Sequence, residues 1–293
     1  MSVKKDIILI TGSNGLLGQE LRILLEKNDY NIIATGIGPD RLLDHNHTYL
    51  ELDISSSLQC NDLLNQYSPS VIINAAACTN VDQCELDQDH CLAVNAHSLN
   101  NFLPYVKANK PHFIQISTDF VFDGLAGNYS EIDHCNPVNF YGFSKLEAER
   151  FLKNATLNHT IVRTSLIYGL RGSNFLTRIK NQLESGADLN IVSDQHRTPT
   201  YVFDLALLIL KIIQIKKYGI YHISSGENLS IFKIVCNIAE YLNTDSSKIN
   251  KVKTVELNQI ASRPANSSLD ISKAVRDLDF KPTTLNNALS KIL

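Results

Sequence analysis

A glycine-rich turn directly after the first apolar segment constrains the fold more than any other stretch of this chain. Residues 7–10 are all isoleucine or leucine, residues 11–18 read Thr-Gly-Ser-Asn-Gly-Leu-Leu-Gly, and a leucine-rich helical pattern follows. This order of strand, turn and helix brings backbone amides and a helix N-terminus close to a pyrophosphate, and side chains at Gly12, Gly15 and Gly18 would obstruct the approach. A plain tight turn is the alternative, but the place immediately after a strand favours a dinucleotide site.

Strands and helices alternate along the first part of the chain. The predicted strands cover residues 7–10, 31–35, 48–52, 71–74, 112–116 and 160–164, and a long helix is predicted from about 84 to 109. This alternation is typical of an α/β fold with a Rossmann-type, doubly wound parallel sheet.

Beyond Gly169 the regular alternation of strands and helices ends. Short predicted strands at 190–192 and 219–223 are mixed with predicted helices at 175–184, 204–215 and 231–242. We therefore expect an NAD(P)-binding Rossmann domain over residues 1–168 and a smaller C-terminal α/β lobe for the substrate over residues 169–293. This division allows individual strands of one domain to pair within the other.

Composition limits the partners and the compartment. With 44% hydrophobic residues, 19% charged residues and a formal charge of -3, the chain has no basic surface for nucleic acid. The apolar stretch before Gly12 is too short for a signal peptide or a membrane span, so we expect a cytoplasmic protein without a membrane partner.

The cysteines and two histidines do not indicate a metal site. The six cysteines form no Cys-x-x-Cys pair and have no histidine at metal-site spacing, which favours free buried or half-buried thiols. His45 and His47 flank Asn46 in a polar stretch, which indicates a solvated loop. No metal is expected.

The segments after the second and third strands concern the adenosine end of a dinucleotide. No acid stands at the end of the second strand, but Asp40 and Arg41 follow, and an arginine there could meet a 2′-phosphate. NADPH is therefore favoured, and NADH remains possible. The third strand ends at Asp53 and Ile54, near where an adenine amino group would lie; alternatively, Asp53 caps a helix that begins near Ser57.

Tyr141 and Lys145 lie four residues apart in a strongly helical stretch. If a helix starts at Asn136-Pro137, both side chains share one face, and the ammonium favours the phenolate, moving proton exchange toward working pH. The strand at 112–116 delivers Thr118 to the carboxyl edge of the sheet, where open α/β sheets keep their chemistry. The Tyr-x-x-x-Lys spacing is common by chance, and its context gives it meaning.

Further blocks, spanning nearly the whole chain, stand in the order of a known family. They are Asn74-Ala-Ala76, Thr79-Asn-Val-Asp82 with Glu85, 117–124, 129–133, 136–137, 163–165, 168–169, 174–175, Gln195 with Pro199-Thr200, 204–206 and 263–270. With the glycine turn, Thr118 and Tyr141-x-x-x-Lys145, they resemble the extended short-chain dehydrogenase/reductases and, more narrowly, the dTDP-4-dehydrorhamnose reductase family of RmlD-like sugar-nucleotide reductases.

The resemblance implies an NAD(P)H-dependent oxidoreductase of polysaccharide precursor synthesis. It would reduce the C4 keto group of a nucleotide-linked 4-keto-6-deoxy sugar, first of all dTDP-4-dehydro-L-rhamnose to dTDP-L-rhamnose. Tyr141 would donate the proton, Thr118 would assist, and Lys145 would hold the nicotinamide ribose. The partner would be the nucleotide-sugar, and a homodimer is left open.

The implied contacts fall into two sets. The predicted cofactor contacts are Gly12, Asn14, Gly15, Leu16, Leu17, Gly18, Arg41, Asp53, Ile54, Ala75, Ala76, Ala77, Thr79, Asn95, Tyr141 and Lys145. The predicted substrate contacts are Thr79, Val81, Thr118, Asp119, Phe120, Asn174, Gln195 and Arg263. Alternatives stay open in the C-terminal part: Asn174 as a helix cap, Pro199 as a turn, and Arg263 as the partner of Asp270.

Two rival functions and three departures qualify the resemblance. A nucleotide-sugar dehydratase or epimerase shares the fold, but dehydratases of this kind place an Asp-Glu pair after the threonine, and here Asp119 is followed by Phe120. A non-catalytic subunit like the β subunit of methionine adenosyltransferase is the second rival.

Three residues depart from the family pattern. Phe120 and Cys78 replace common tyrosines, and Leu166 stands where some members carry tryptophan, so the exact sugar stays open.

Overall fold

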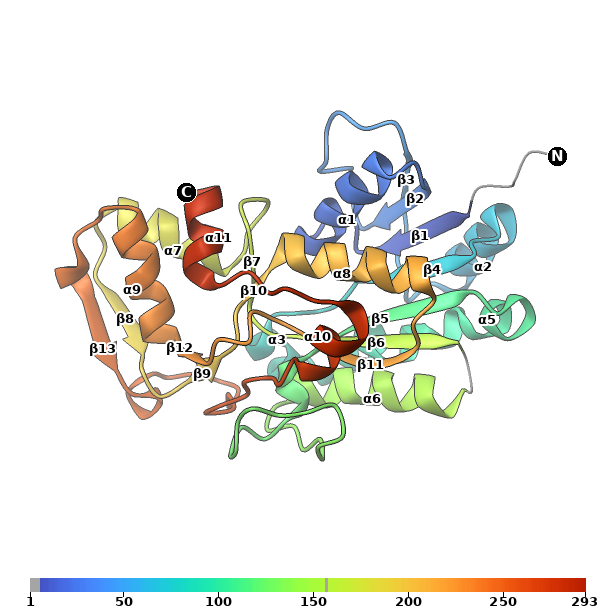
Figure 1. Cartoon of the computed structure of the whole chain (residues 1–293). Coiled ribbons are helices and arrows are strands. Elements are labelled where there is room, and N and C mark those ends of the chain that lie inside the picture. The colour runs from blue at the N-terminus through green and yellow to red at the C-terminus, as the bar shows by residue number, and fades with distance from the viewer. Residues whose placement is uncertain (1–5, 156–157) are drawn as a thin grey trace.

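A seven-stranded parallel sheet forms the centre of the computed structural model, which describes residues 6–155 and 158–293 (Figure 1). The strand order is β11-β6-β5-β4-β1-β2-β3, and every neighbouring pair is parallel. Their bounds are β1 Ile7–Thr11, β2 Asn31–Gly36, β3 Thr48–Glu51, β4 Val71–Asn74, β5 His112–Thr118, β6 His159–Thr164 and β11 Gly219–Ile223. The predicted doubly wound α/β fold is confirmed. The chain reverses its direction of winding between β1 and β4, where open sheets leave a crevice.

Both faces of the sheet are covered, because side chains alternate along each strand. Ile8 and Ile10 of β1 pack into one core with α1 (Leu16–Lys27), α8 (Val202–Ile215) and α10 (Ser272–Leu278). Leu9 packs into the opposite core with α2 (Ser57–Tyr67), α5 (Leu103–Asn109) and α6 (Phe140–Asn154). Figure 1 shows α8 on one side of the strands and α6 on the other.

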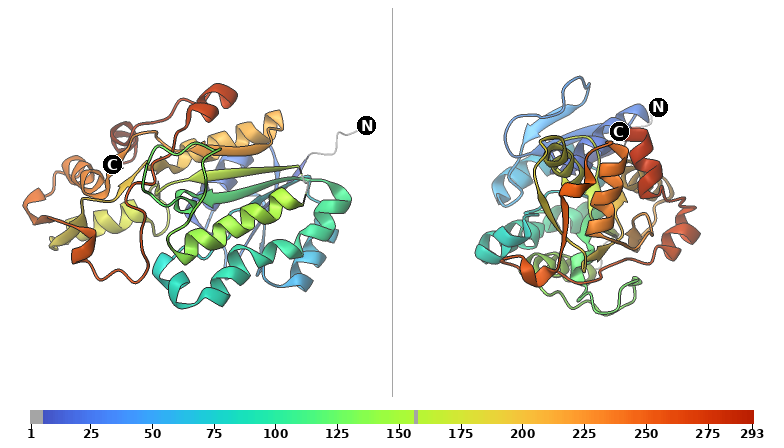
Figure 2. Two further views of the ribbon diagram at one scale, coloured as in Figure 1. Left: turned by 90° about the horizontal axis from the view of Figure 1, so that it is seen from below. Right: turned by 90° about the vertical axis from the view of Figure 1, so that its left-hand side faces the viewer.

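A smaller cluster lies beyond the carboxyl ends of the strands, at the left of Figure 1. It contains α7 (Phe175–Glu184), α9 (Ile231–Tyr241), α11 (Leu285–Ile292) and the paired strands β8 (Leu189–Val192) and β13 (Ile249–Val252). Its separate core includes Leu176, Ile234 and Leu289. In the left view of Figure 2 its yellow and orange segments gather at the end opposite the N-terminus.

Short two-stranded pairings connect this cluster to the sheet. They are β7 (Ile167–Tyr168) with β10 (Thr200–Tyr201) and β9 (His196–Arg197) with β12 (Leu229–Ser230). The later part of the chain also returns to the main sheet, because β11 pairs with β6 and the helices α8 and α10 cover the sheet. Residues beyond 168 therefore build both the cluster and one edge of the Rossmann-type core.

The predicted long helix over 84–109 is wrong. The structure has four short helices there, α3 (Val81–Leu86), α4 (Gln88–Asn95), η1 (His97–Asn101) and α5. The breaks have local causes: the Asp87 side chain accepts a hydrogen bond from the His90 amide and starts α4, and Pro104 stands in the first turn of α5. Among residues 6–155 and 158–293, no helix is long and apolar enough to cross a membrane.

Candidate active site

A cavity of about 580 Å³ opens at the carboxyl edge of the sheet, between the Rossmann-type core and the smaller cluster. It is lined by Gly12, Gly15, Leu16, Leu17, Gly18, Ala75, Ala76, Ala77, Thr79, Val81, Ile116, Ser117, Thr118, Asp119, Phe120, Tyr141, Lys145, Thr164, Leu166, Ile167, Ser173, Asn174, Phe175 and Arg197. Segments that are far apart in sequence therefore share one wall. All three predicted catalytic side chains are among them.

The glycine turn packs too closely for side chains at two of its three glycines. A β carbon at Gly12, whose φ is +65°, would lie 2.6 Å from the Ala76 amide nitrogen, and one at Gly18 would lie 2.5 Å from the Gly12 carbonyl oxygen. Gly15 is the N-cap of α1 and makes no side-chain cap, so backbone amides of the first turn stay available to a ligand. The turn can thus hold a pyrophosphate.

The helix that carries Tyr141 and Lys145 begins later than predicted. The Asn139 side chain accepts a hydrogen bond from the Gly142 amide (2.8 Å), so α6 starts at Phe140 and the predicted start at 136–137 is wrong. Tyr141 and Lys145 still share one face, four residues apart. Both line the cavity.

Three side chains converge at the centre of this wall. Thr118, at the end of β5, lies within hydrogen-bonding reach of the Tyr141 phenol. The rings of Phe120 and Tyr141 meet edge to face with centroids 6.0 Å apart. A hydroxyl and a phenol are therefore available together to a substrate oxygen.

The expected lowering of the Tyr141 pKa is not found. Burial raises the pKa of Tyr141 well above its usual range, and the hydrogen bond with Thr118 offsets only part of this. Burial lowers the pKa of Lys145 to about 8, against the attraction of Glu149. At neutral pH the tyrosine is thus a neutral phenol, the form that donates a proton, and the lysine carries its charge.

Polar side chains surround the buried Asp119, the residue after Thr118. The Ser267 hydroxyl donates a hydrogen bond to the Asp119 carboxylate, and Arg197 Nε lies 3.7 Å from Oδ2 of the same group. The Arg197 guanidinium also lies 5.0 Å from the Phe120 ring centroid. Burial raises the pKa of Asp119, while Arg197 opposes that shift.

Sequence reasoning missed Arg197. Its Nη1 donates to the carbonyl oxygens of His196 (2.7 Å) and Pro264 (2.9 Å), which fixes a cation at the cavity wall. The signal was present, since a charged residue stands inside the block from Gln195 to Thr200. The other cavity residues outside the predicted sets are Ile116, Ser117, Thr164, Leu166, Ile167, Ser173 and Phe175.

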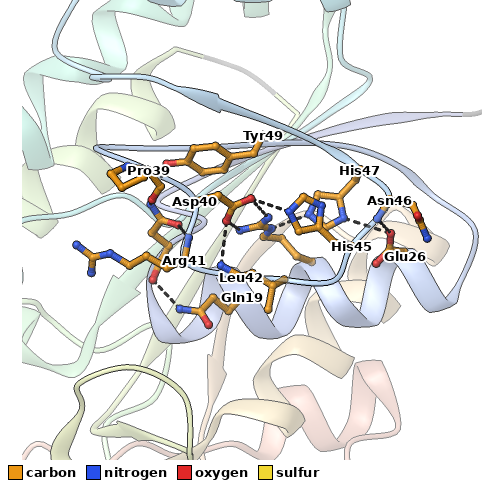
Figure 3. Close-up of polar contacts among 12 residues, drawn as sticks. Gln19, Glu26, Pro39, Asp40, Arg41, Leu42, His45, Asn46, His47 and Tyr49 are labelled. Atoms are coloured by element: carbon orange, nitrogen blue, oxygen red, sulfur yellow. Dashed lines mark hydrogen bonds and ion pairs between the residues drawn. The ribbon is translucent and has the colours of Figure 1, made fainter.

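The loop after β2 is organised by Asn14 and Asp40 (Figure 3). Asn14 Nδ2 donates to the Pro39 carbonyl (3.0 Å), and its Oδ1 accepts from the Arg41 amide (3.0 Å). The Asp40 carboxylate turns inward and accepts two hydrogen bonds from the buried Arg22 (2.7 and 2.6 Å). The Arg41 side chain is exposed, and in Figure 3 it points away from this network.

The predicted loop at His45 and His47 is present, but the two rings are largely buried rather than solvated. The two rings stack with centroids 4.0 Å apart, His45 Nε2 lies 2.7 Å from Asp40, and Arg22 Nε donates to His47 (2.7 Å). Arg22 is fully buried, so its guanidinium requires Asp40 and His47 as hydrogen-bond acceptors. Within the described residues, no group of three or more His, Cys, Asp or Glu side chains could hold a metal ion.

Seven predicted contacts do not line the cavity: Asn14, Arg41, Asp53, Ile54, Asn95, Gln195 and Arg263. Asp53 accepts hydrogen bonds from the amide and hydroxyl of Ser55, and α2 is capped by Ser56, so its alternative as that helix cap is wrong. Ile54 is buried in the core. Asn95 lies behind the wall, where it binds both the amide (2.8 Å) and the carbonyl (3.0 Å) of Cys78.

Asn174, Gln195 and Arg263, three of the predicted substrate residues, make structural contacts. Asn174 caps α7 in a capping box, as its alternative had it, and also lines the cavity. Gln195 donates to Thr254 and Gln259, each at 3.1 Å. Arg263 pairs with Asp82 through two hydrogen bonds of 2.7 and 2.8 Å, so the alternative pairing with Asp270 is wrong.

Known proteins resemble this chain over nearly its whole length. The model of the RmlD substrate binding domain family matches residues 6–293. The chain is 32% identical to a dTDP-4-dehydrorhamnose reductase of Aggregatibacter actinomycetemcomitans over 97% of each chain. It is 31% identical to the spore coat polysaccharide biosynthesis protein SpsK of Bacillus subtilis, covering 98% of this chain and 96% of that one.

Among solved structures, the dTDP-4-dehydrorhamnose reductase of Bacillus anthracis in complex with NADP superposes with a TM-score of 0.88. The two are 31% identical, and the match covers 98% of both chains.

Proposed function

The chain belongs to the RmlD substrate binding domain family, and from this premise we propose that it reduces dTDP-4-dehydro-L-rhamnose to dTDP-L-rhamnose with NADPH. NADH is a possible second donor. One observation carries the proposal: Thr118, Tyr141 and Lys145 line the same cavity as the glycine turn. The proposed proton donor and the proposed dinucleotide site therefore line one cavity.

The catalytic roles follow from the protonation states. Bound nicotinamide supplies the hydride for the C4 carbonyl carbon. Tyr141, a neutral phenol, gives its proton to the carbonyl oxygen, and the Thr118 hydroxyl supplies a second hydrogen-bond donor as negative charge develops there. Lys145, charged at neutral pH, stabilises the phenolate left on Tyr141 and binds the nicotinamide ribose.

The proposed cofactor contacts begin at the glycine turn and extend to Arg41. The glycine turn and the first turn of α1 hold the pyrophosphate, and the small residues Ala75, Ala76 and Ala77 let the nicotinamide end lie against the backbone. Arg41 binds the 2′-phosphate of NADPH. Asp40 does not compete with that phosphate for Arg41, because Arg22 holds its carboxylate inward.

The substrate contacts come from both parts of the chain. We assign cofactor binding to residues 1–168 and the substrate lobe to the cluster within 169–293, since β11, α8 and α10 of that range belong to the Rossmann-type core. Val81, Phe120 and Asn174 face the sugar. Arg197 supplies a fixed cation for the nucleotide-sugar. Gln195 and Arg263 shape the wall through Thr254 and Asp82 rather than by contact.

The rival functions lack support from the site. Water elimination across two sugar carbons requires an acid and a base beside the threonine, and the single carboxylate there, Asp119, is held by Ser267 and faces Arg197. A purely regulatory subunit does not require the complete set of Thr118, Tyr141 and Lys145. The six free thiols also fit a reducing compartment, so we propose a cytoplasmic location.

The test is NADPH oxidation against a panel of dTDP- and UDP-linked 4-keto-6-deoxy sugars. We expect turnover with dTDP-4-dehydro-L-rhamnose at a kcat/KM well above that for the other sugars. Cofactor binding without turnover on any keto-sugar would support the regulatory alternative. Release of water from a dTDP-hexose would support the dehydratase alternative.

A further inference from the structure

Three thiols meet directly behind the wall of the cavity. Cys78 stands between Ala77 and Thr79, which both line the cavity, while Cys84 lies in α3 and Cys91 in α4. Cys84 Sγ is 3.5 Å from Cys78 Sγ and 3.5 Å from the Cys78 carbonyl oxygen. A hydrogen bond also joins the thiols of Cys84 and Cys91, so the three sulfur atoms form a continuous chain.

This thiol chain is tied to the helix of the catalytic residues. Asn95 binds the backbone of Cys78 on both sides and donates to the Ser144 hydroxyl (2.9 Å). Cys91 Sγ lies 3.3 Å from the same hydroxyl, and Ser144 precedes Lys145 on α6. A change at Cys78 therefore acts on both the cavity wall and the support of the catalytic helix.

We propose that Cys78 and Cys84 are a redox modification site, in which a peroxide converts the two thiols into a reversible disulfide that distorts the cavity wall. The cross-link itself does not depend on the reaction assigned above. Only its effect on turnover rests on the proposed function.

The steps balance with hydrogen peroxide as the oxidant. The Cys78 sulfur, as thiolate, attacks one peroxide oxygen, the O–O bond breaks, Cys78 becomes a sulfenic acid, and the released hydroxide takes a proton to give water. The Cys84 sulfur, as thiolate, then attacks the Cys78 sulfur and expels hydroxide, which becomes the second water. Two thiols and one peroxide thus yield one disulfide and two waters.

Access and proton transfer favour this order. Cys78 is half-buried, whereas Cys84 and Cys91 are fully buried, so a small oxidant reaches Cys78 first. The hydrogen bond from Cys84 lowers the pKa of Cys91, and the same contact raises the pKa of Cys84. Because Cys91 contacts the Cys84 thiol directly, it is placed to take the Cys84 proton when Cys84 attacks.

Closing the bond requires a defined displacement. A disulfide has an S–S length of about 2.05 Å, so the two sulfur atoms must approach by about 1.5 Å. Asn95 holds the Cys78 backbone at both its amide and its carbonyl, and the strain falls on Ala77 and Thr79 beside the cofactor. Only part of this movement reaches the cavity wall, and we expect it to cost about tenfold or more in rate.

The test is disulfide mapping of the purified protein after treatment with hydrogen peroxide and alkylation of the remaining thiols. No lysine or arginine lies between Arg41 and Lys107, so a protease that cuts at aspartate is needed; cleavage at Asp82 separates Cys78 from Cys84, and cleavage at Asp87 separates Cys84 from Cys91. We expect one cross-link, Cys78 to Cys84, removed by dithiothreitol. Free, alkylated Cys78 and Cys84 after peroxide treatment would overturn the proposal.

Two variants sharpen the result. Cys84→Ala should accumulate a sulfenic acid at Cys78, trapped by dimedone, and the half-buried Cys236→Ala on α9 is the matched control that should keep the cross-link. Oxidised wild-type protein should lose about tenfold or more in kcat/KM and recover with dithiothreitol. If the cross-link forms without any loss of activity, the distortion of the wall is refuted; if no keto-sugar is turned over at all, the mapping still decides the cross-link.

Discussion

Gly142 lies so close to Phe120 that a β carbon at position 142 would stand 2.1 Å from the Phe120 carbonyl oxygen. This contact sets the distance between the first turn of α6, which carries Tyr141, and the end of β5, which carries Thr118. The phenol and the hydroxyl are thus brought together by a glycine that does not itself line the cavity.

Gly142→Ala should displace Tyr141 from Thr118. We expect kcat to fall by about 10²-fold, because a shift of roughly 1 Å at the reacting groups has effects of that size. Steady-state kinetics, with thermal unfolding to confirm folding, measure this. Phe143→Ala, an exposed change on the next residue, is the control, and equal losses in both variants would contradict the packing argument.

Tyr141→Phe removes the proposed proton donor and leaves the ring. Turnover should fall by about 10²-fold or more, the usual scale for a lost acid catalyst, while the Kd for NADPH stays nearly unchanged. Fluorescence titration with NADPH and a turnover assay separate the two effects. A variant with near wild-type turnover would show that another group delivers the proton.

The pH profile should report Lys145. Burial lowers the pKa of Lys145 to about 8, so the lysine is charged below that pH and loses its charge as the pH rises through it. We therefore expect kcat/KM to decline above about pH 8. Lys145→Arg keeps its charge to higher pH, and whatever activity it retains should decline later; an unshifted limb would assign the ionisation to another group.

Arg41→Ala should weaken the preference for NADPH. An exposed contact between a guanidinium and a phosphate contributes about 1–2 kcal/mol, so kcat/KM with NADPH should fall about tenfold and that with NADH should hardly change. Comparing both cofactors in the variant and in Arg276→Ala, an exposed arginine on α10, tests this. Equal losses with both cofactors would remove Arg41 from the 2′-phosphate.

Asp40→Asn should destabilise the protein by about 3 kcal/mol at pH 7, because it leaves the buried Arg22 without its counter-charge. Burial alone would raise the pKa of Asp40, but hydrogen bonds from Arg22, the Leu42 amide and His45 hold it well below its usual range. Its stabilisation is therefore fully present above about pH 4, declines as the pH falls below that value, and is gone only below the lowered pKa of the folded state. Urea unfolding at pH 7 and pH 3 should show the gap between wild type and variant narrowing at the lower pH.

Local patterns predicted much of the fold. The apolar runs at 7–10, 71–74 and 112–116 became β1, β4 and β5, because a strand buried on both faces leaves a continuous hydrophobic signature. The helix predicted at 175–184 matches α7. The 84–109 helix failed since Asp87 and Pro104 interrupt it, and helical composition does not show such breaks.

The buried polar groups were hidden from sequence reasoning. His45 and His47 looked like members of a solvated loop, yet their rings stack, and His47 accepts a hydrogen bond from Arg22 of α1. Arg263 pairs with Asp82 across most of the chain rather than with its sequence neighbour Asp270. Ion-pair and hydrogen-bond partners that lie far apart in sequence cannot be predicted from residue spacing.

The sequence by itself determined the glycine turn, the order of strands and helices, and the residue types proposed for catalysis, because these depend on backbone conformation and on contacts within a few residues. Only the tertiary structure decided what surrounds them: the neutral state of a buried Tyr141, the cation of Arg197 at the wall, and the inward Asp40 that leaves Arg41 exposed. Burial and long-range pairing set those properties, and both arise only when distant segments pack together.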